Sequence, residues 1–474
     1  MQLSKEIAGA AGLVDEDRQM IAQLVDTWSQ HLATNVLRDS YYNGDVGVKD
    51  LGVSVAPDLV KRLNPRIDWA AKCVNWWADH VQFEGFSCAD KDAQAQLETV
   101  CRLNDMDNLM RKVVQSSLRH SVSFITVTKG NAGEGNVVVS GYPATSAAAL
   151  YSHALKRIKA GLVVVDSELN KSTRKQEPTL VYVFDDTRVI VLERDNAKRW
   201  YATITPHALG RVPMEHVAYH STLERPFGSS RISHTVMSLV DDAQRELMNM
   251  SACASFAAAP QKYLTGASDG TAGSLAKTPY GAYISSWIIA TLNQNGQAPQ
   301  FGQLPQLQMQ PHTDYMRMLA SMFSDATNVP LASLGFSSTN PTSADAILAS
   351  QEDAIVDISN YIQACKRALS NVGALIMASV EDKPYTESVE NRAITALFAN
   401  PSTPSPVSMS DAVQKRIAAF PWMANSDIPL RDLGYKDDEL AQLQQDRKKA
   451  QGAQLVQASL QAMQSTQPAQ GKGN

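Results

Sequence analysis

One run of apolar residues constrains the fold of this chain more than any other feature. The run advances by alternating steps of three and four residues, which places all its members on one face of a helix. Its members are Ile355, Ile358, Ile362, Cys365, Leu369, Val372 and Ile376. Thr342 or Ser343 fits the N-cap, with Asp345 in the first turn. We therefore expect a helix of roughly 35 to 40 residues, about 55 Å long.

A helix of this length is a rigid element. Its row of apolar residues, called here the seam, must be covered by another surface. The seam can be buried within its own subunit or packed against another subunit. The sequence leaves both alternatives open. The residues predicted to pack this seam are Ile355, Ile358, Ile362, Leu369, Val372 and Ile376.

The periodicity of the sequence changes along the chain and predicts an α+β fold. Helical spacing covers about 14–42, the region of Trp69 to Trp77, and 91–120. Short β-rich segments separated by turn residues follow from 121 to 220, a pattern typical of antiparallel hairpins. Helical spacing returns at about 230–258, 312–328, 410–420 and 437–463, and one strand pair is expected around 280–292.

Composition narrows the class of protein. The length of 474 residues predicts roughly three domains. The net charge of −5 argues against a surface that grips nucleic acid by neutralising phosphates. The five cysteines are widely spaced, without a Cys-x-x-Cys pair, so we expect reduced thiols. The N-terminus lacks a signal-peptide pattern, and no apolar run approaches the ~20 residues of a membrane helix, so we expect a soluble, cytosolic product.

The sequence lacks the common catalytic motifs, including the phosphate-binding loop, the Gly-x-Ser-x-Gly elbow and His-Glu-x-x-His. His216 and His220 have the spacing of two metal ligands on a helix, but their context favours a strand. The adjacent aspartates at 185–186 and 241–242 fit a turn and a solvated helix face, because neighbouring side chains diverge. We expect no enzymatic activity, metal or cofactor.

The stretch between Arg317 and Lys366 contains no Lys or Arg. A surface past which DNA slides should not hold phosphates, because each neutralised phosphate adds affinity that movement must break. The stretch suits that role if it faces DNA, and an ordinary acidic helix start is the alternative. Its acidic residues are Asp325, Asp345, Glu352, Asp353 and Asp357.

Four stretches, in their order and spacing, resemble the portal proteins of tailed bacteriophages, of the siphophage type. The first joins Tyr-Tyr-Asn-Gly-Asp at 41–45 to Val-Gln-Phe-Glu-Gly-Phe at 81–86. The second is Arg-Pro-Phe-Gly-Ser-Ser-Arg-Ile at 225–232, which opens a helix. The others are Asn-Val-Pro-Leu at 328–331 with Leu334-Gly335, and Ser-Ala-Asp-Ala-Ile at 343–347, which opens the long helix. The resemblance covers about residues 20 to 380.

The resemblance implies a multi-domain portal fold that is mainly helical, with an antiparallel β wing, a small α/β clip and long channel-side helices. Its regions are a wing at 1–229, stem helices at 230–259 and 312–329, a clip at 260–311, a tunnel loop at 330–343, a long wing or tunnel helix at 344–383, a helical crown at 384–464 and a disordered tail at 465–474. The clip and crown are placed by position alone. The tunnel-loop residues expected to touch DNA are Leu334, Gly335, Phe336, Ser337, Ser338, Thr339 and Asn340.

The resemblance also implies a function. The chain would form a dodecameric ring at one capsid vertex, nucleate procapsid assembly, and provide the channel for packaging and ejection of double-stranded DNA. Its partners would be other copies of itself, DNA, the terminase large subunit, the head-tail connector, and the major capsid and scaffold proteins, with no membrane. Its location would be the virion, and the host cytoplasm during assembly. The alternatives are another structural protein of the virion, such as a minor head or connector protein, and a hydrolase.

Overall fold

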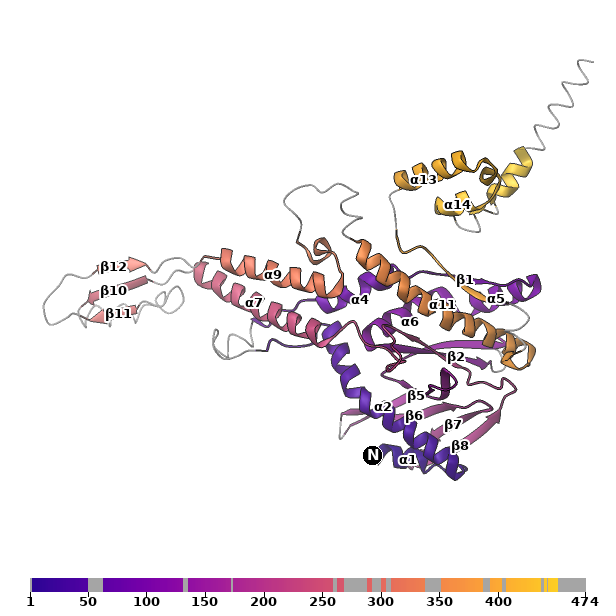
Figure 1. Cartoon of the computed structure of the whole chain (residues 1–474). Helices are drawn as coiled ribbons and strands as arrows, with labels where there is room; N and C mark the ends of the chain where they lie inside the picture. The colour runs from indigo at the N-terminus through magenta and orange to yellow at the C-terminus, as the bar shows by residue number, and fades with distance from the viewer. Residues whose placement is uncertain are drawn as a thin grey trace, which may run out of the picture. The chain divides into compact units, whose positions relative to one another are not determined.

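The computed structural model of the chain describes residues 2–49, 63–130, 135–171, 174–258, 262–267, 288–291, 300–303, 308–336, 351–386, 393–402, 406–435, 439–440 and 442–450. The chain divides into two compact units, Met1–Pro401 and Ser402–Asn474. The larger unit holds every sheet among the described residues (Figure 1). No described helix combines the length and apolar character that a membrane span requires.

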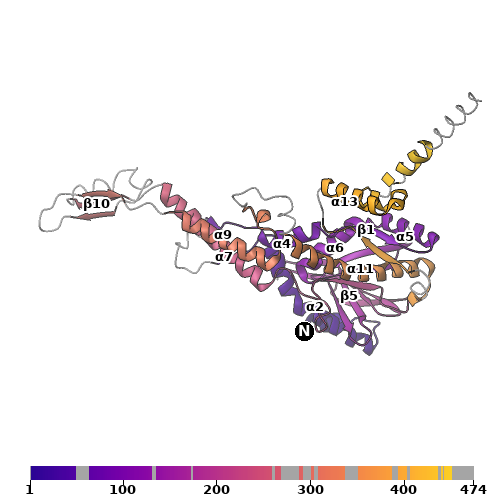
Figure 2. The same ribbon diagram turned by 45° about the horizontal axis from the view of Figure 1, so that its top comes forward.

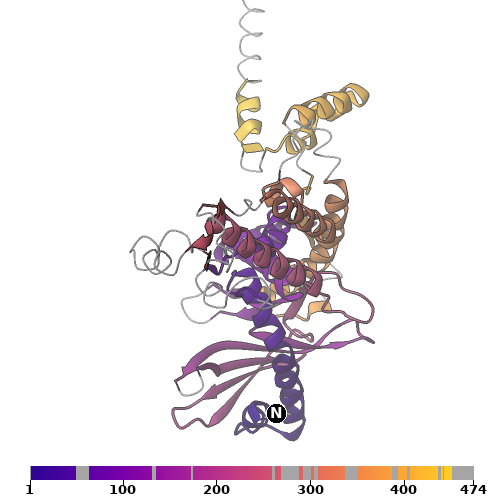
Figure 3. The same cartoon turned by 90° about the vertical axis from the view of Figure 1, so that its left-hand side faces the viewer.

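A five-stranded antiparallel sheet in the order β4-β5-β6-β7-β8 occupies the N-terminal half of the larger unit. Its strands are β4 Ala147–Ser152, β5 Arg157–Asn170, β6 Lys175–Phe184, β7 Arg188–Arg194 and β8 Trp200–Pro206. Helices α1 (Gln2–Ala8) and α2 (Asp15–Tyr42) cover one face and share an apolar core with it. Figure 3 shows these indigo helices, beside the N label, lying against the strands. The expectation of antiparallel hairpins in this region is confirmed.

A three-stranded antiparallel sheet, in the order β3-β2-β9, packs against the other face of the larger sheet. Its strands are β2 Val122–Lys129, β3 Val137–Pro143 and β9 Met214–Ala218. The two sheets approach closely where Gly161 meets Met214, because a Cβ on Gly161 would lie 2.1 Å from the Met214 sulfur. Alternate residues of β2 point away from this contact: Ile125 and Val127 belong to the main helical core.

Helices α4 (Trp69–Asp79), α5 (Lys91–Leu103) and α6 (Met106–His120) pack in that main core. The prediction of one helix across 91–120 is wrong, because the chain breaks at Asn104 and Asp105. Asp105 adopts a left-handed conformation with φ 47°, which Asp tolerates better than most residues. The Asn104 amide bonds the backbone of β3, accepting from Val139 N at 2.9 Å and donating to Val137 O at 3.0 Å.

A pair of helices, α7 (His234–Ala258) and α9 (Gln310–Thr327), leads into and out of a small sheet. Figures 1 and 2 show the two helices side by side. The small sheet has the order β11-β10-β12, with β10 (Lys262–Ala267) parallel to β11 (Ile288–Thr291) and antiparallel to β12 (Gln300–Gln303). Strand β11 falls within the pair expected around 280–292, and the rest of that pair lies outside the described residues.

The long helix α11 spans Glu352–Glu381 in the described residues and ends at Asp382, which is left-handed at φ 56°. It packs against β9, β2 and α5. The expected cap at Thr342 or Ser343 lies outside the described residues. Beyond it, β13 (Thr395–Phe398) pairs antiparallel with β1 (Phe83–Ser87).

The smaller unit contains α13 (Pro406–Ala419), a 3-10 turn η2 (Pro421–Asn425) and α14 (Ile428–Asp432). Helix α13 agrees with the helical spacing at 410–420. The unit begins at Ser402, whereas the predicted crown begins at 384. The difference arises because β13 follows residue 384 and completes a sheet of the larger unit. The expected disordered tail at 465–474 lies outside the described residues.

Candidate functional site at the base of the helix pair

The start of α7 is fixed by the turn that the sequence carries at 225–232. Gly228 adopts φ +68°, and a Cβ at this position would lie 2.0 Å from the Tyr219 carbonyl oxygen, so only glycine fits. The next residue, Ser229, donates its N–H to that same oxygen at 2.8 Å, and Arg231 N donates to Leu118 O at 2.9 Å. The turn therefore joins the start of α7 to β9 and α6.

Arg231 holds several elements together at this point. Its side chain is buried, and its Nε donates to Cys73 O of α4 at 2.8 Å. Its Nη1 donates to the Tyr219 hydroxyl at 3.0 Å, and its Nη2 donates to Thr327 O. The guanidinium lies over the Trp77 ring, 3.7 Å from the centroid, where the ring face attracts a cation. Thr327 ends α9, so Arg231 also satisfies a carbonyl at the negative end of a helix.

The sequence identified 225–232 as a stretch that opens a helix but assigned Arg231 no role. Its partners lie 12 to 158 residues away along the chain. No local spacing connects such positions, so the sequence carries no signal for the role of Arg231.

Tyr41, in the first stretch that resembles portal proteins, also contacts α7. Its hydroxyl donates to Asp241 Oδ1 at 2.9 Å, and Lys49 Nζ donates to Asp241 Oδ2 at 2.6 Å. The neighbouring Asp242 pairs with Arg245 instead. The expectation that these aspartates lie on a solvated helix face is therefore wrong for Asp241, which is buried at 9 % exposure and held by Tyr41 and Lys49. The two carboxylates have separate partners.

The chain leaves α9 through a fixed connection rather than a free loop. Asn328 caps the helix with φ 51°, and its amide donates to Asp357 Oδ2 of α11 at 2.9 Å. Val329 is fully buried, and its carbonyl accepts from Ser324 Oγ at 2.7 Å. The short 3-10 turn η1, Leu331–Leu334, follows and ends at Gly335, which has φ 90°.

The predicted tunnel loop is described only at its beginning. Leu334 and Phe336 are half-buried and pack against the main core, while Gly335 is exposed. Leu334 and Phe336 therefore attach the beginning of the segment to the core. Ser337, Ser338, Thr339 and Asn340 lie outside the described residues.

The acidic residues of the stretch without Lys or Arg differ in their surroundings. Asp325, Glu352 and Asp353 are exposed, so they repel a passing phosphate backbone if they face one. Asp357 is bonded to Asn328 and has a structural role. Asp345 lies outside the described residues.

The α11 seam is buried inside the chain. Ile355 is half-buried, and the other predicted packing residues are 4 % exposed or less and belong to the main core. Of the two alternatives, the structure supports packing within the subunit for these five residues. They are Ile358, Ile362, Leu369, Val372 and Ile376.

The aspartate and histidines that the sequence analysis weighed as catalytic or metal-binding residues have contacts that explain them as parts of the fold. Asp185 directly follows β6; burial opposes its ionisation, but hydrogen bonds from Thr187 and Arg188 lower its pKa. His216 lies in β9 among aromatic rings, including Phe227 at 5.3 Å between centroids, and burial lowers its pKa to about 4. His220 lies beyond the strand, so the two histidines do not share a helical face. Across the described ranges, no cluster of three His, Cys, Asp or Glu could hold a metal.

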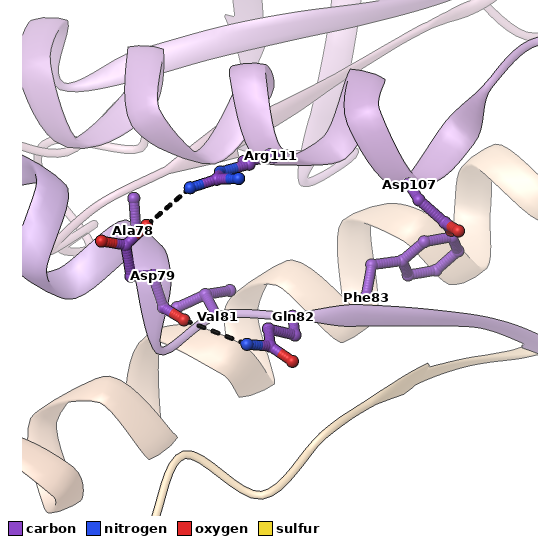
Figure 4. A pocket seen from close by; sticks show the side chains of 7 residues that line it. All are labelled: Ala78, Asp79, Val81, Gln82, Phe83, Asp107 and Arg111. Carbon is purple, nitrogen blue, oxygen red and sulfur yellow. Dashed lines mark hydrogen bonds and ion pairs between the residues drawn. The ribbon is translucent and has the colours of Figure 1, made fainter. Parts of the chain in front are cut away.

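A cavity of about 310 Å³ lies where α4, β1 and α6 meet. Its lining residues, shown in Figure 4, are Ala78, Asp79, Val81, Gln82, Phe83, Asp107 and Arg111. Arg111 pairs with Asp79 at 2.9 Å, with both side chains more than half exposed. Enzyme pockets position substrate with desolvated polar groups, so this exposed pair does not indicate a catalytic site.

Comparison with known proteins gives concordant matches. A family model described as "Phage portal protein, SPP1 Gp6-like" matches residues 22–403. The portal protein of Mycobacterium phage L5 is 25 % identical over 436 residues, covering 89 % of this chain and 85 % of that protein. The portal protein of Mycobacterium phage D29 is 26 % identical over 449 residues, covering 91 % of this chain and 87 % of that protein.

Two solved structures are also similar. A chain of the "Virion of native gene transfer agent (GTA) particle" has a TM-score of 0.46 and 14 % identity, covering 85 % of this chain and 99 % of that one. A chain of the "Neck of native GTA particle computed with C12 symmetry" has a TM-score of 0.44 and 12 % identity, covering 84 % of this chain and 98 % of that one.

Proposed function

The chain belongs to the SPP1 Gp6-like phage portal family, and on that basis we propose that twelve copies form a ring at one capsid vertex. Double-stranded DNA enters the capsid through the ring during packaging and leaves through it during ejection. The observation that carries this proposal is the family match across residues 22–403. The relatives named portal protein match over most of their own length and most of this chain, which supports the same function.

The regions of the fold receive proposed roles from the family. Residues up to 229 and α11 form the wing, and α7 and α9 form the stem. The small sheet of β10, β11 and β12 forms the clip, which docks the terminase large subunit and later the head-tail connector. The unit from Ser402 forms the crown.

The tunnel loop is proposed at 330–343. Leu334 and Phe336 fix its beginning in the core, and the residues after them, Ser337 to Asn340, touch the DNA. A small polar tip without cations suits this role, because it makes no strong phosphate contact. The rigid connection through Asn328 and Val329 supports this proposal, since a loop that contacts moving DNA needs a fixed base.

The family is structural rather than enzymatic. We further propose that this chain hydrolyses no nucleotide, and that the terminase supplies the energy for packaging. During assembly in the host cytoplasm the ring nucleates the procapsid through contacts with the major capsid and scaffold proteins. In the mature virion it remains at the portal vertex.

Deletion of Ser337–Asn340 tests the tunnel-loop assignment. We expect rings to assemble normally, because the described anchor residues are untouched, and packaged DNA per capsid to fall. The measurement is nuclease-protected DNA in a packaging assay, with ring assembly followed by electron microscopy. The control replaces the same four residues with a Gly-Ser linker of equal length, which separates the loss of length from the loss of side chains. Normal packaging by the deletion variant would show that this segment is not the tunnel loop.

A further inference from the structure

Three chemically reactive side chains meet between α7 and α9, away from the base of the helix pair. His312 on α9 lies between Glu246 and Cys253, both on α7. His312 Nδ1 is 2.6 Å from Glu246 Oε1, and His312 Nε2 is 3.5 Å from Cys253 Sγ. None of the sequence motifs indicated this cluster, because His312 is 59 residues from Cys253.

The arrangement is a linear relay rather than a metal cage. The carboxylate and the sulfur lie at opposite nitrogens of the ring, so they do not converge on one point. The carboxylate accepts a hydrogen bond, so Nδ1 must carry the proton, and a neutral ring then presents the Nε2 lone pair to the thiol. The Glu246 side chain is only 8 % exposed, and its second oxygen accepts from Asn249 at 3.5 Å. The carboxylate is therefore held in position, and it in turn orients the imidazole.

Cys253 is one of the three thiols of the chain that are not fully buried. It is partly exposed, and its helix neighbours Ala252 and Ala254 are small, with Ala254 exposed. In contrast, Cys73 and Cys365 are fully buried, and burial raises their pKa values to about 11 and about 12. Burial likewise raises the pKa of Cys101 to about 12.

We propose that Cys253 is a nucleophilic thiol, with His312 as its proton acceptor and Glu246 as the positioning residue for His312, and that the site takes small disulfides and other soft electrophiles. The thiol proton moves to His312 Nε2 while Sγ attacks one sulfur of the disulfide. A mixed disulfide forms, the old S–S bond breaks, and the second sulfur leaves as a thiolate. The exchange needs no other oxidant. It does not depend on the proposed portal function.

The test follows the reaction of the full-length chain with dithiobisnitrobenzoate by the absorbance of the released thionitrobenzoate, with the modified cysteine identified by peptide mass. We expect Cys253 to react about tenfold faster than Cys88, a second thiol that is not fully buried. C253S should remove the fast phase, whereas the control C88S should retain it.

Variants of the relay separate nucleophile activation from simple helix packing. H312Q should slow the fast phase about tenfold and make its rate fall more steeply as the pH is lowered. E246Q should slow it less, since the amide can still orient the ring. The control H31Q, at an exposed histidine of α2, should change nothing. Thermal unfolding checks that each variant is folded. If H312Q does not fold, the rate of E246Q tests the relay instead.

Two results would overturn the proposal. One is a Cys253 rate no higher than that of Cys88. The other is a fast phase whose rate and pH profile are the same in the wild type and in the folded relay variants. Either result would mean that the cluster only joins α7 to α9.

Discussion

At the scale of single residues, Arg231 makes the most consequential contacts in the described structure. One guanidinium satisfies carbonyl groups of α4 and α9 and a tyrosine hydroxyl, all within the core. Removing it deprives each of these buried acceptors of one donor, and a buried group left unsatisfied costs about 1–3 kcal/mol. The geometry of the α7 start and the end of α9 therefore depends on this side chain.

We predict that R231M lowers the free energy of unfolding by about 3 kcal/mol or more, and that R231K loses less because it retains the charge. The matched control is R225M, an exposed arginine of the same turn, which should change stability by less than about 0.5 kcal/mol. Chemical denaturation followed by circular dichroism measures both. Equal effects of R231M and R225M would contradict the role of Arg231.

At the scale of elements, the long helix shows what the sequence can and cannot predict. The alternating spacing of three and four residues predicts α11 and its apolar face, because a helix converts spacing into direction. The spacing does not identify the surface that covers the face, so both alternatives stayed open. The structure supports burial against β2, β9 and α5 of the same chain.

L369A tests this burial. Leu369 is fully buried, so the cavity left by alanine should lower the free energy of unfolding by about 2–5 kcal/mol. V356A, at a position 55 % exposed on the same helix, should have an effect below about 0.5 kcal/mol. If the seam instead joined subunits, L369A would reduce the mass of the ring and leave the unfolding of the single chain unchanged.

The errors and omissions of the sequence predictions share a physical cause. The break between α5 and α6 depends on the Asn104 amide bonding to β3, more than 30 residues away. Strand β13 depends on pairing with β1, more than 300 residues earlier. Arg231 and the relay at His312 likewise depend on distant partners. Local pattern predicts single elements well, whereas contacts of this kind become visible only in the folded chain.

At the scale of the whole molecule, the proposed function rests on family membership, and the fold explains how the regions that carry it are held in place. The small sheet is connected to the rest of the chain through α7 and α9. The Arg231 contacts join the base of this helix pair to the main core. The region of the predicted tunnel loop leaves that base through a short rigid segment. A ring built from such subunits places the same loop at every symmetry-related position around one axis.

The most direct test of this account is the assembly state of the full-length chain. Purified protein, expressed alone and with its scaffold protein, is examined by negative-stain electron microscopy and by light scattering. The account predicts rings with an open central hole and a mass about twelve times that of one chain. A compact monomer or dimer under both conditions would contradict it.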